Sequence, residues 1–437
     1  MPVLPVELVQ LILSFIPPRC LEPNNSQNYL SQPVASTVAA CGLVCRSWLS
    51  ASRRILFHRT RIPLKKAHLF EKLISPPGKL RQNNNDETPL ATFLPYIREL
   101  HIGPGLGENR WMLSVFRDRI SPLLQHGLVT MILEASHWAE QDKIIPLPPV
   151  TQFTRLTRFE LRGAWPVRLQ EVLCCISGLP VLEELIIASF RCFQDAPSSA
   201  RKRRGSSLID AKTPPAPPTT LRKLGLIYMT SYPIFRWIFN SGVRLQLEVL
   251  QFTFPGTIRN ATSLAIAYAR DALALVARHQ ATLQSLGLRF RSSANFGYDE
   301  LEDWDAIRTD AGYDRIFAEP NPCTKFLHAH RKLRRLHLEA KAPILIRFLR
   351  QALEGANCLP GLRELILSMP TLYDPECALI DSLLCSQPEK LQGLEHVVLE
   401  PEHCSDLDAS RLKLPLSIAR GEYFLEARVP RQDSELF

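Results

Sequence analysis

The sequence has no charge-free apolar run of membrane-spanning length and no repeated pair spacing among its cysteines. The best candidate for a span within its 437 residues, SLAIAYARDALALVA, carries Arg270 and Asp271 in its middle. Its eleven cysteines, an odd number, are scattered, which favours the reduced thiols of the cytosol or nucleus over the disulfide framework of a secreted protein. We therefore expect a cytoplasmic or nuclear protein that is neither secreted nor embedded in a membrane.

Signatures of catalysis are also missing. No nucleophile elbow, zinc-protease helix or kinase signature occurs. The glycine-rich stretch IGPGLGENR (102–110) lacks Gly-Lys-Ser/Thr, and the third glycine of a dinucleotide fingerprint falls at Glu108. Cys323, His328 and His330 have no second ligand pair nearby and give only a weak zinc signal. We expect no catalytic residue, no cofactor and no metal site, and so a protein that is not an enzyme.

One basic cluster stands out from the rest of the charge. The formal net charge is +9, of which RKRR (Arg201, Lys202, Arg203 and Arg204) supplies four. The surrounding segment is rich in Pro, Ser and Ala and has no hydrophobic period, which predicts an exposed loop. The cluster is a candidate nuclear import signal, and the alternative is a solvated loop that no partner reads.

A six-residue pattern recurs along most of the chain. Apolar residues occupy its first, fourth and sixth positions, and the matches begin at residues 97, 128, 156, 182, 221, 247, 283, 333, 362 and 394. Helical periodicity follows several matches, as in LQEVLCCISGL (169–179) and PILIRFLRQALEGA (343–356). The pattern predicts an α/β fold of about ten strand-helix repeats.

The positions between the apolar ones are largely polar. A doubly wound enzyme sheet, which is one interpretation of alternating strands and helices, would have central strands apolar on both faces. Here one face is expected to be buried and the other exposed to solvent. The exposed face mixes charges of both signs, which argues against nucleic acid and favours a protein or peptide partner. The candidate target-binding residues on it are Glu99, His101, Arg158, Glu160, Arg162, Lys223, Gln251, Arg289, Arg335, His337, Glu364 and His396.

This repeated combination of one buried and one wet face resembles the leucine-rich repeat family. The resemblance implies an irregular solenoid in which strands line an exposed concave sheet and helices cover the outside. The sequence departs from the family because Asn or Cys does not follow the third leucine position, as at 103–105 and 228–229. The widest intervals place insertion loops near 192–220 and 291–325.

The amino-terminal segment has a different pattern. LPVELVQLILSFI (4–16) is apolar around most of a helix, with Glu7, Gln10 and Ser14 in one polar stripe. A second amphipathic helix, with a break in its last turns, is expected within 34–59, with apolar residues at Cys41, Val44, Cys45, Trp48, Ile55 and Leu56. Two such helices bury little surface, so their apolar face is expected to need a partner.

Residues 2–60 resemble the F-box family through LPVEL (4–8) and LVCRSW (43–48). The resemblance implies docking on a Skp-type adaptor and, through it, on a cullin. The docking positions that it implies are Leu4, Pro5, Leu8, Ile12, Leu43, Val44 and Trp48. The long loop between the two helices departs from the family pattern. The alternative is a helical cap that shields the first repeat of the solenoid.

Together the two resemblances imply the substrate-recognition subunit of a Skp-cullin-F-box ubiquitin ligase, whose concave face holds a target protein. We expect an F-box module at 1–66, a linker or first cap at 67–95, a leucine-rich repeat solenoid at 96–425 and a tail at 426–437. The alternative function is a leucine-rich repeat scaffold outside ubiquitination. Neither nucleic acid nor a membrane is an expected partner.

Overall fold

The structure is a computed structural model that describes residues 32–44, 46–63, 66–74, 93–103, 116–118, 120–134, 147, 150–193, 215–227, 232–255, 271–291, 330–340, 342–354, 359, 361–369, 374–386, 391, 393–401 and 424–427. The chain forms two compact units. Unit 1 comprises Met1–Leu185 and Phe190–Thr220, and unit 2 comprises Ile186–Ser189 and Leu221–Phe437. Each unit is described by itself below.

All ten sequence windows contain a strand, which confirms the predicted α/β class with a parallel sheet. Each strand begins at the third residue of its window, at the point where apolar and polar residues alternate. In unit 1 these strands are β2 (Glu99–Gly103), β3 (Thr130–Glu134), β4 (Arg158–Arg168) and the first residues of β5 (Glu184–Phe193). In unit 2 they are β6 (Lys223–Ile227), β7 (Val249–Pro255), β8 (Ser285–Arg291), β9 (Arg335–Glu339), β10 (Glu364–Met369) and β11 (His396–Pro401).

Two further strands escaped the sequence pattern. β1 (Arg59–Pro63) pairs in parallel with β2, and β12 (Phe424–Ala427) pairs in parallel with β11. β1 has a single buried residue, Ile62, so it lacks the three apolar positions of the pattern. A strand therefore lies inside the segment 1–66 that was expected to be helical, and the helix α4 (Ala67–Ile74) lies inside the expected linker.

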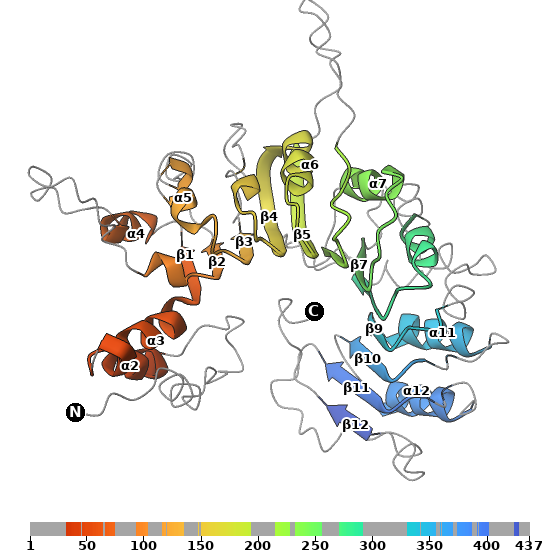
Figure 1. Ribbon diagram of the computed structural model, residues 1–437. Helices are drawn as coiled ribbons and strands as arrows, with labels where there is room; N and C mark the ends of the chain where they lie inside the picture. The colour runs from red at the N-terminus through yellow and green to blue at the C-terminus, as the bar shows by residue number, and fades with distance from the viewer. Residues whose placement is uncertain are drawn as a thin grey trace, which may run out of the picture. The chain divides into compact units, whose positions relative to one another are not determined.

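Neighbouring strands are parallel and follow chain order within each unit (Figure 1). The register aligns equivalent positions of successive repeats. In unit 1, Glu99 is level with Thr130, which is level with Arg158. In unit 2, Ser285, Arg335, Glu364 and His396 form one row. Each unit therefore presents one face of aligned apolar side chains and one face of aligned, mostly polar positions, which we call the polar face.

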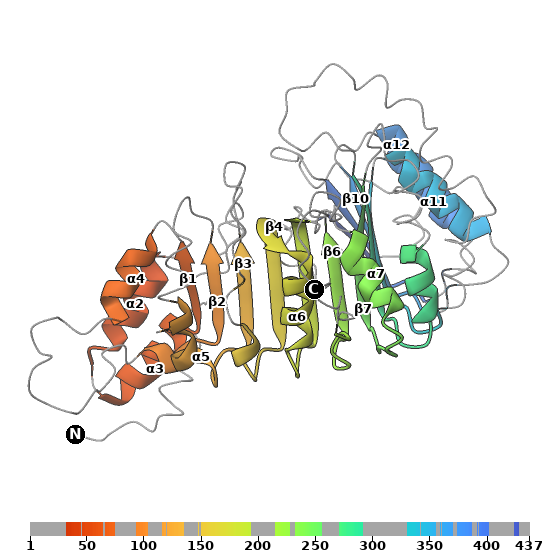
Figure 2. The same cartoon turned by 90° about the horizontal axis from the view of Figure 1, so that it is seen from above.

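Helices cover the apolar face in unit 2. Phe235 of α7 (Tyr232–Asn240) lies 6.0 Å, ring to ring, from Phe252 of β7. Phe348 of α11 (Ala342–Glu354) lies 6.4 Å from Phe290 of β8. α12 (Asp374–Ser386) lies beside α11 (Figure 2). Burying each such large apolar side chain contributes about 1.5–3 kcal/mol to folding, so these contacts fix the helices on this face.

Unit 1 has shorter covering elements. α6 (Leu169–Ser177) buries Val172, Leu173 and Ile176, and α5 (Ser121–Leu124) and the 3-10 helices η2 (Leu94–Tyr96) and η4 (Val150–Gln152) complete this layer. Phe93, before η2, packs against Phe57 at 4.8 Å and Phe70 at 6.0 Å between ring centroids. These rings join α3 and α4 to the segment that precedes η2. No helix in the described part of the chain is both long and apolar enough to cross a membrane.

The amino-terminal helix expected over 34–59 is two helices, so that prediction was wrong. α2 (Gln32–Cys41) and α3 (Arg46–Phe57) are separated by a turn at Gly42 to Val44. The Gly42 N–H donates to the carbonyl oxygens of Val38 and Ala39, which tightens the last turn of α2. Glycine is about 1 kcal/mol less favourable in a helix than alanine, so the helix ends there. Val44, expected within the helix, lies in the exposed turn.

Candidate functional site

Two apolar side chains lie open to solvent at the α2–α3 turn of unit 1. Leu43 is 86% exposed and Val44 is 66% exposed, whereas the other exposed large apolar residues of the described chain are less than half exposed. Both residues are positions that the F-box resemblance assigns to adaptor docking. Their exposure forms an apolar tip on this helix pair, and no helix or strand in the described part of the chain covers it.

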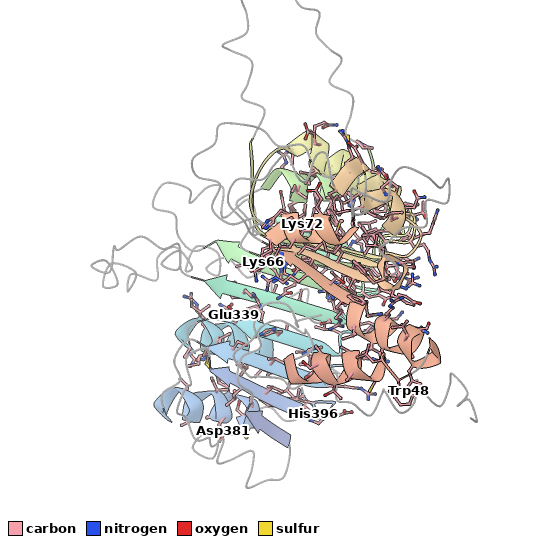
Figure 3. The ribbon with its side chains drawn as sticks, turned by 90° about the vertical axis from the view of Figure 1, so that its left-hand side faces the viewer. Trp48, Lys66, Lys72, Glu339, Asp381 and His396 are labelled. Atoms are coloured by element: carbon pink, nitrogen blue, oxygen red, sulfur yellow. The ribbon has the colours of Figure 1, made fainter. Side chains whose placement is uncertain are left out.

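Trp48, also assigned to docking, has a different environment. It lies on α3 (Figure 3), is partly buried, and packs with Cys41 and Ile55 around the buried Ala51. This cluster holds α2 and α3 together, so Trp48 supports the helix pair that presents Leu43 and Val44. The remaining docking candidates, Leu4, Pro5, Leu8 and Ile12, lie outside the described residues.

The polar face of unit 1 is a set of ion pairs between neighbouring strands. Arg59 Nε lies 2.7 Å from Glu99 Oε2, and Arg158 Nη1 lies 3.0 Å from Glu184 Oε1. The His101 ring donates from Nε2 to Glu134 Oε2 at 2.8 Å. This hydrogen bond is the main reason that the pKa of Glu134 is lowered. The parallel register brings these side chains within reach of one another, because adjacent strands lie about 4.8 Å apart.

Glu160 is the deepest charge of this face. It is 1% exposed, although the sequence placed it on a wet surface. Arg158 and Arg162 on the same strand both pair with its carboxylate, Arg158 through Nη2 at 3.5 Å. A buried carboxylate needs such partners because desolvation would otherwise raise its free energy by several kcal/mol. His101, at 9% exposure, is likewise buried rather than wet.

In unit 2 the prediction of an exposed face was wrong over most of its width. Gln251, Arg289 and His337 are between 2% and 6% exposed. Between them the face carries apolar and small residues: Ile186, Ala188 and Ile227 form a buried cluster, Ile366 and Val398 are buried, and glycines lie at 225 and 287. Parallel strands buried on both sides have this composition. The sequence pattern did not predict this burial, because the apolar residues of the face are spread over different repeats.

Arg289 and His337 are held by buried partners. Arg289 Nε lies 2.9 Å from Glu339 Oε2 at the end of β9 (Figure 3), and His337 Nε2 lies 2.8 Å from Ser368 Oγ. Burial, with smaller effects from Arg289 and Arg335, lowers the pKa of His337 to about 3. A Ser-His pair is the start of a nucleophilic site, but a base with so low a pKa accepts a proton poorly near neutral pH.

Gln251 is buried without hydrogen-bond partners. Both its amide nitrogen and its amide oxygen are unpaired, as is Thr253 Oγ1 two residues along β7. The Gln251 side chain lies over Gly287, where an added Cβ would come within 3.0 Å of Gln251 Cγ. An unsatisfied buried polar group costs about 1–3 kcal/mol. The sequence has no signal for this feature, since it depends on which neighbours the register supplies.

The accessible part of the polar face is a row at the amino-terminal ends of the strands. The half-buried candidates are Glu99, Arg158, Arg162, Lys223, Arg335 and Glu364, and His396 is exposed. All of these except Arg162 are the first residue of their strand, as His396 illustrates in Figure 3. The predicted target-binding surface is thus reduced to this row, of which each unit holds its own part.

The weaker sequence candidates do not assemble into a site among the described residues. His330 is 3% exposed, and its Nε2 donates to the Val276 carbonyl at 2.9 Å. Cys323 and His328 lie outside the described residues, as do Arg201, Lys202, Arg203 and Arg204. Over the described ranges, no group of three or more His, Cys, Asp or Glu side chains could hold a metal ion. Comparison with protein families and with curated proteins finds no match for this chain.

Proposed function

We propose that this protein is the substrate-recognition subunit of a Skp-cullin-F-box ubiquitin ligase. In this proposal the helices at the amino-terminal end dock on a Skp-type adaptor, and the repeat region, an irregular leucine-rich repeat solenoid, binds a target protein. The mechanism is placement. A bound target is held near a conjugating enzyme carried elsewhere in the complex, which raises the effective concentration of its lysines there.

The observation that carries the proposal is the exposure of Leu43 and Val44 at the α2–α3 turn. Soluble proteins rarely leave adjacent large apolar side chains in solvent unless a partner covers them. They lie in the turn between α2 and α3, whose helices are held together by the cluster of Trp48 and Ala51, and so form a small exposed apolar contact. Such a tip is suited to an apolar groove on an adaptor, because its burial would be driven by the hydrophobic effect.

The repeat region supports the second half of the proposal. In both units the strands pair in chain order with neighbours of the same register, and helices lie on the apolar face. This is the arrangement expected for stacked strand-helix units. The accessible first residues of the strands supply charged groups of both signs, which favours recognition of a protein surface.

The test is co-expression of the full chain with a Skp-type adaptor, followed by co-purification. Leu43→Glu and Val44→Glu place a charge at the exposed tip, so each should abolish co-purification while circular dichroism still reports a folded chain. Leu123→Glu is the matched control, because Leu123 is 47% exposed on α5, and it should leave co-purification unchanged. Trp48→Ala is less informative, since it also opens the cluster around Ala51.

The alternative function, a repeat scaffold unconnected with ubiquitination, makes the opposite prediction. Wild type, folded Leu43→Glu and folded Leu123→Glu would then all fail to retain the adaptor. In that case the α2–α3 helices would act as a cap on the first strands of unit 1. If the wild type and all of the variants retain the adaptor equally well, the docking surface lies elsewhere than at this turn.

A further inference from the structure

A surplus of positive charge lies on the turn that precedes β9. Arg331, Lys332 and Arg334 are all exposed, and they make no ion pair or side-chain hydrogen bond within the part of the chain that the structure describes. We call these three residues the basic turn. Most charged side chains of the polar face are paired, so the basic turn differs from that face in having charge that is still available to a partner.

The basic turn is held firmly from both sides. The Leu333 N–H donates to the His330 carbonyl at 3.1 Å, and the buried His330 ring bonds to Val276. On the other side, the turn before β10 packs tightly, because an added Cβ on Gly361 would lie 2.6 Å from the Arg331 carbonyl oxygen. The three cationic side chains therefore project from a fixed backbone, which lowers the entropy lost when a ligand orders them.

The basic turn continues onto the neighbouring strand. The Arg363 N–H donates to the Arg334 carbonyl at 2.8 Å, which places the two arginines side by side, immediately before β10 and β9. Arg363 pairs with Glu395 at 3.2 Å, but both side chains are more than half exposed. Such an exposed pair contributes little, about 0–1 kcal/mol. A stronger anionic ligand could exchange with Glu395 and use Arg363 as a fourth cation.

We propose that the basic turn is a docking site for an acidic peptide segment, one with several neighbouring Asp or Glu residues. Arginine side chains offer carboxylates two parallel hydrogen bonds, and lysine adds a point charge. The backbones of neighbouring strands lie about 4.8 Å apart, so one extended acidic segment can contact both the basic turn and Arg363. This proposal rests on the receptor function proposed above and specifies the kind of target segment that the receptor would bind.

A nucleic acid fits this surface less well. No Phe, Tyr or Trp occurs in the described turns at 241–248, 279–284, 330–334, 361–363 and 393–395 of unit 2, and single strands are bound largely by stacking bases on aromatic rings. Glu248, Glu364 and Glu395 are also interspersed at the same ends of the strands. They would repel a phosphate backbone that crosses several strands, whereas a short acidic segment needs to contact only the basic turn and Arg363.

The experiment measures fluorescence anisotropy of a labelled oligoglutamate peptide titrated with the full chain. The triple variant Arg331→Ala/Lys332→Ala/Arg334→Ala should bind roughly tenfold more weakly, since each exposed charge pair is of modest strength. The matched control is Arg54→Ala/Lys72→Ala/Arg155→Ala, which removes three exposed cations from unit 1 and leaves the same net charge. It should bind as the wild type does. If the triple variant does not fold, the single variant Arg334→Ala replaces it, and a smaller loss of peptide affinity is expected.

Equal weakening in the triple variant and its control would overturn the proposal, because overall charge would then explain binding. No weakening in the triple variant, or no binding by the wild type, would overturn it as well. Tighter binding of a labelled oligodeoxythymidylate that the triple variant loses would assign the turn to nucleic acid instead. The assay needs no adaptor, so its failure is separate from failure of co-purification in the Leu43→Glu experiment.

Discussion

The polar face differs between the two units, although one sequence pattern generates it in both. In unit 1 it is made of charges that pair between and along strands, such as Arg59 with Glu99 and Arg158 with Glu184, and most of these remain half-exposed. In unit 2 the central positions are buried and carry apolar, small or neutral residues, with one buried pair, Arg289 and Glu339. The same alternation thus produces a solvated ionic face and a second core.

This difference shows that alternation determines the direction of side chains but not their environment. A half-exposed charge such as Arg59 in unit 1 can be stabilised by water as well as by its partner, so losing the partner costs little. The buried charges of Arg289 and Glu339 in unit 2 depend on each other far more, because water barely reaches them. Energetic consequences of equivalent substitutions should therefore be much larger in unit 2.

The largest effect is expected from breaking the buried pair. Arg289→Ala leaves the Glu339 carboxylate buried without its guanidinium and should lower the free energy of unfolding by about 3–5 kcal/mol. Arg59→Ala in unit 1 removes a pair of similar length whose side chains are 36% and 30% exposed, and should cost less than about 1 kcal/mol. Urea denaturation of both variants measures the difference.

A rescue variant separates charge from packing. Arg289→Met/Glu339→Leu replaces both charges with apolar groups and should recover most of the loss, because a buried pair is seldom better than an apolar replacement. Equal losses for Arg289→Ala and Arg59→Ala would mean that solvent reaches the face of unit 2 as it does in unit 1.

A smaller, pH-dependent effect is expected from His337. Its pKa is about 3 in the folded chain, against about 6.5 when unfolded. Between these values the unfolded state binds more protons, so the stability present above pH 6.5 falls as pH decreases, by about 1.4 kcal/mol per pH unit. Burial is the main cause, and the facing groups are Ser368, Arg289 and Arg335.

The measurement compares thermal midpoints of wild type and His337→Gln at neutral and mildly acidic pH. Glutamine can keep a hydrogen bond to Ser368 but does not titrate, so the variant should lose less stability on acidification. In unit 1 the pKa of Glu134 is lowered, so this carboxylate affects stability at lower pH. Its contribution to stability is complete above about pH 4.5 and is lost as the pH falls below that value. Identical acid sensitivity of wild type and variant would contradict the burial of His337.

The smallest effect concerns two glutamines. Gln251→Met in unit 2 replaces an unpartnered buried amide with an apolar side chain of similar shape, and should raise the free energy of unfolding by about 1 kcal/mol. Gln152 in unit 1 accepts a hydrogen bond from Ser121 Oγ at 3.1 Å, so Gln152→Met should lower it slightly. A destabilising Gln251→Met, measured by the same urea titration, would indicate that the amide has a partner.

The sequence predicted the strands well and their surroundings poorly. Windows such as LRELIL (362–367) carry three apolar positions, and the strand β10 follows directly from them. β1 was missed because only Ile62 is buried, and the break at Gly42 was placed too late because apolar periodicity continues through the turn. The burial of Gln251 and Arg289 could not be predicted, since it depends on which side chains the register sets beside them.

Docking on an adaptor stays a prediction, and the structure describes the environments of only three of its seven residues. Leu43 and Val44 are exposed, whereas Trp48 is partly buried, in keeping with its place in the apolar pattern with Cys41 and Ile55. The basic turn was overlooked because HRKLRRL (330–336) was read only for its leucines. The positive charge of this turn indicates a binding site only when the structure is known. The structure shows that the neighbouring turn lies beside it and that Glu395 pairs with Arg363.

The pairing of each strand with its chain neighbours also shapes how the protein folds. Since contacts within a unit join segments that are close in sequence, folding can begin at one repeat and extend to the next, and no distant pairing has to form first. Unfolding should be equally local. Opening caused by Arg289→Ala should appear first as faster hydrogen exchange in β7, β8 and β9, while the amides of β2 and β3 in unit 1 keep their protection.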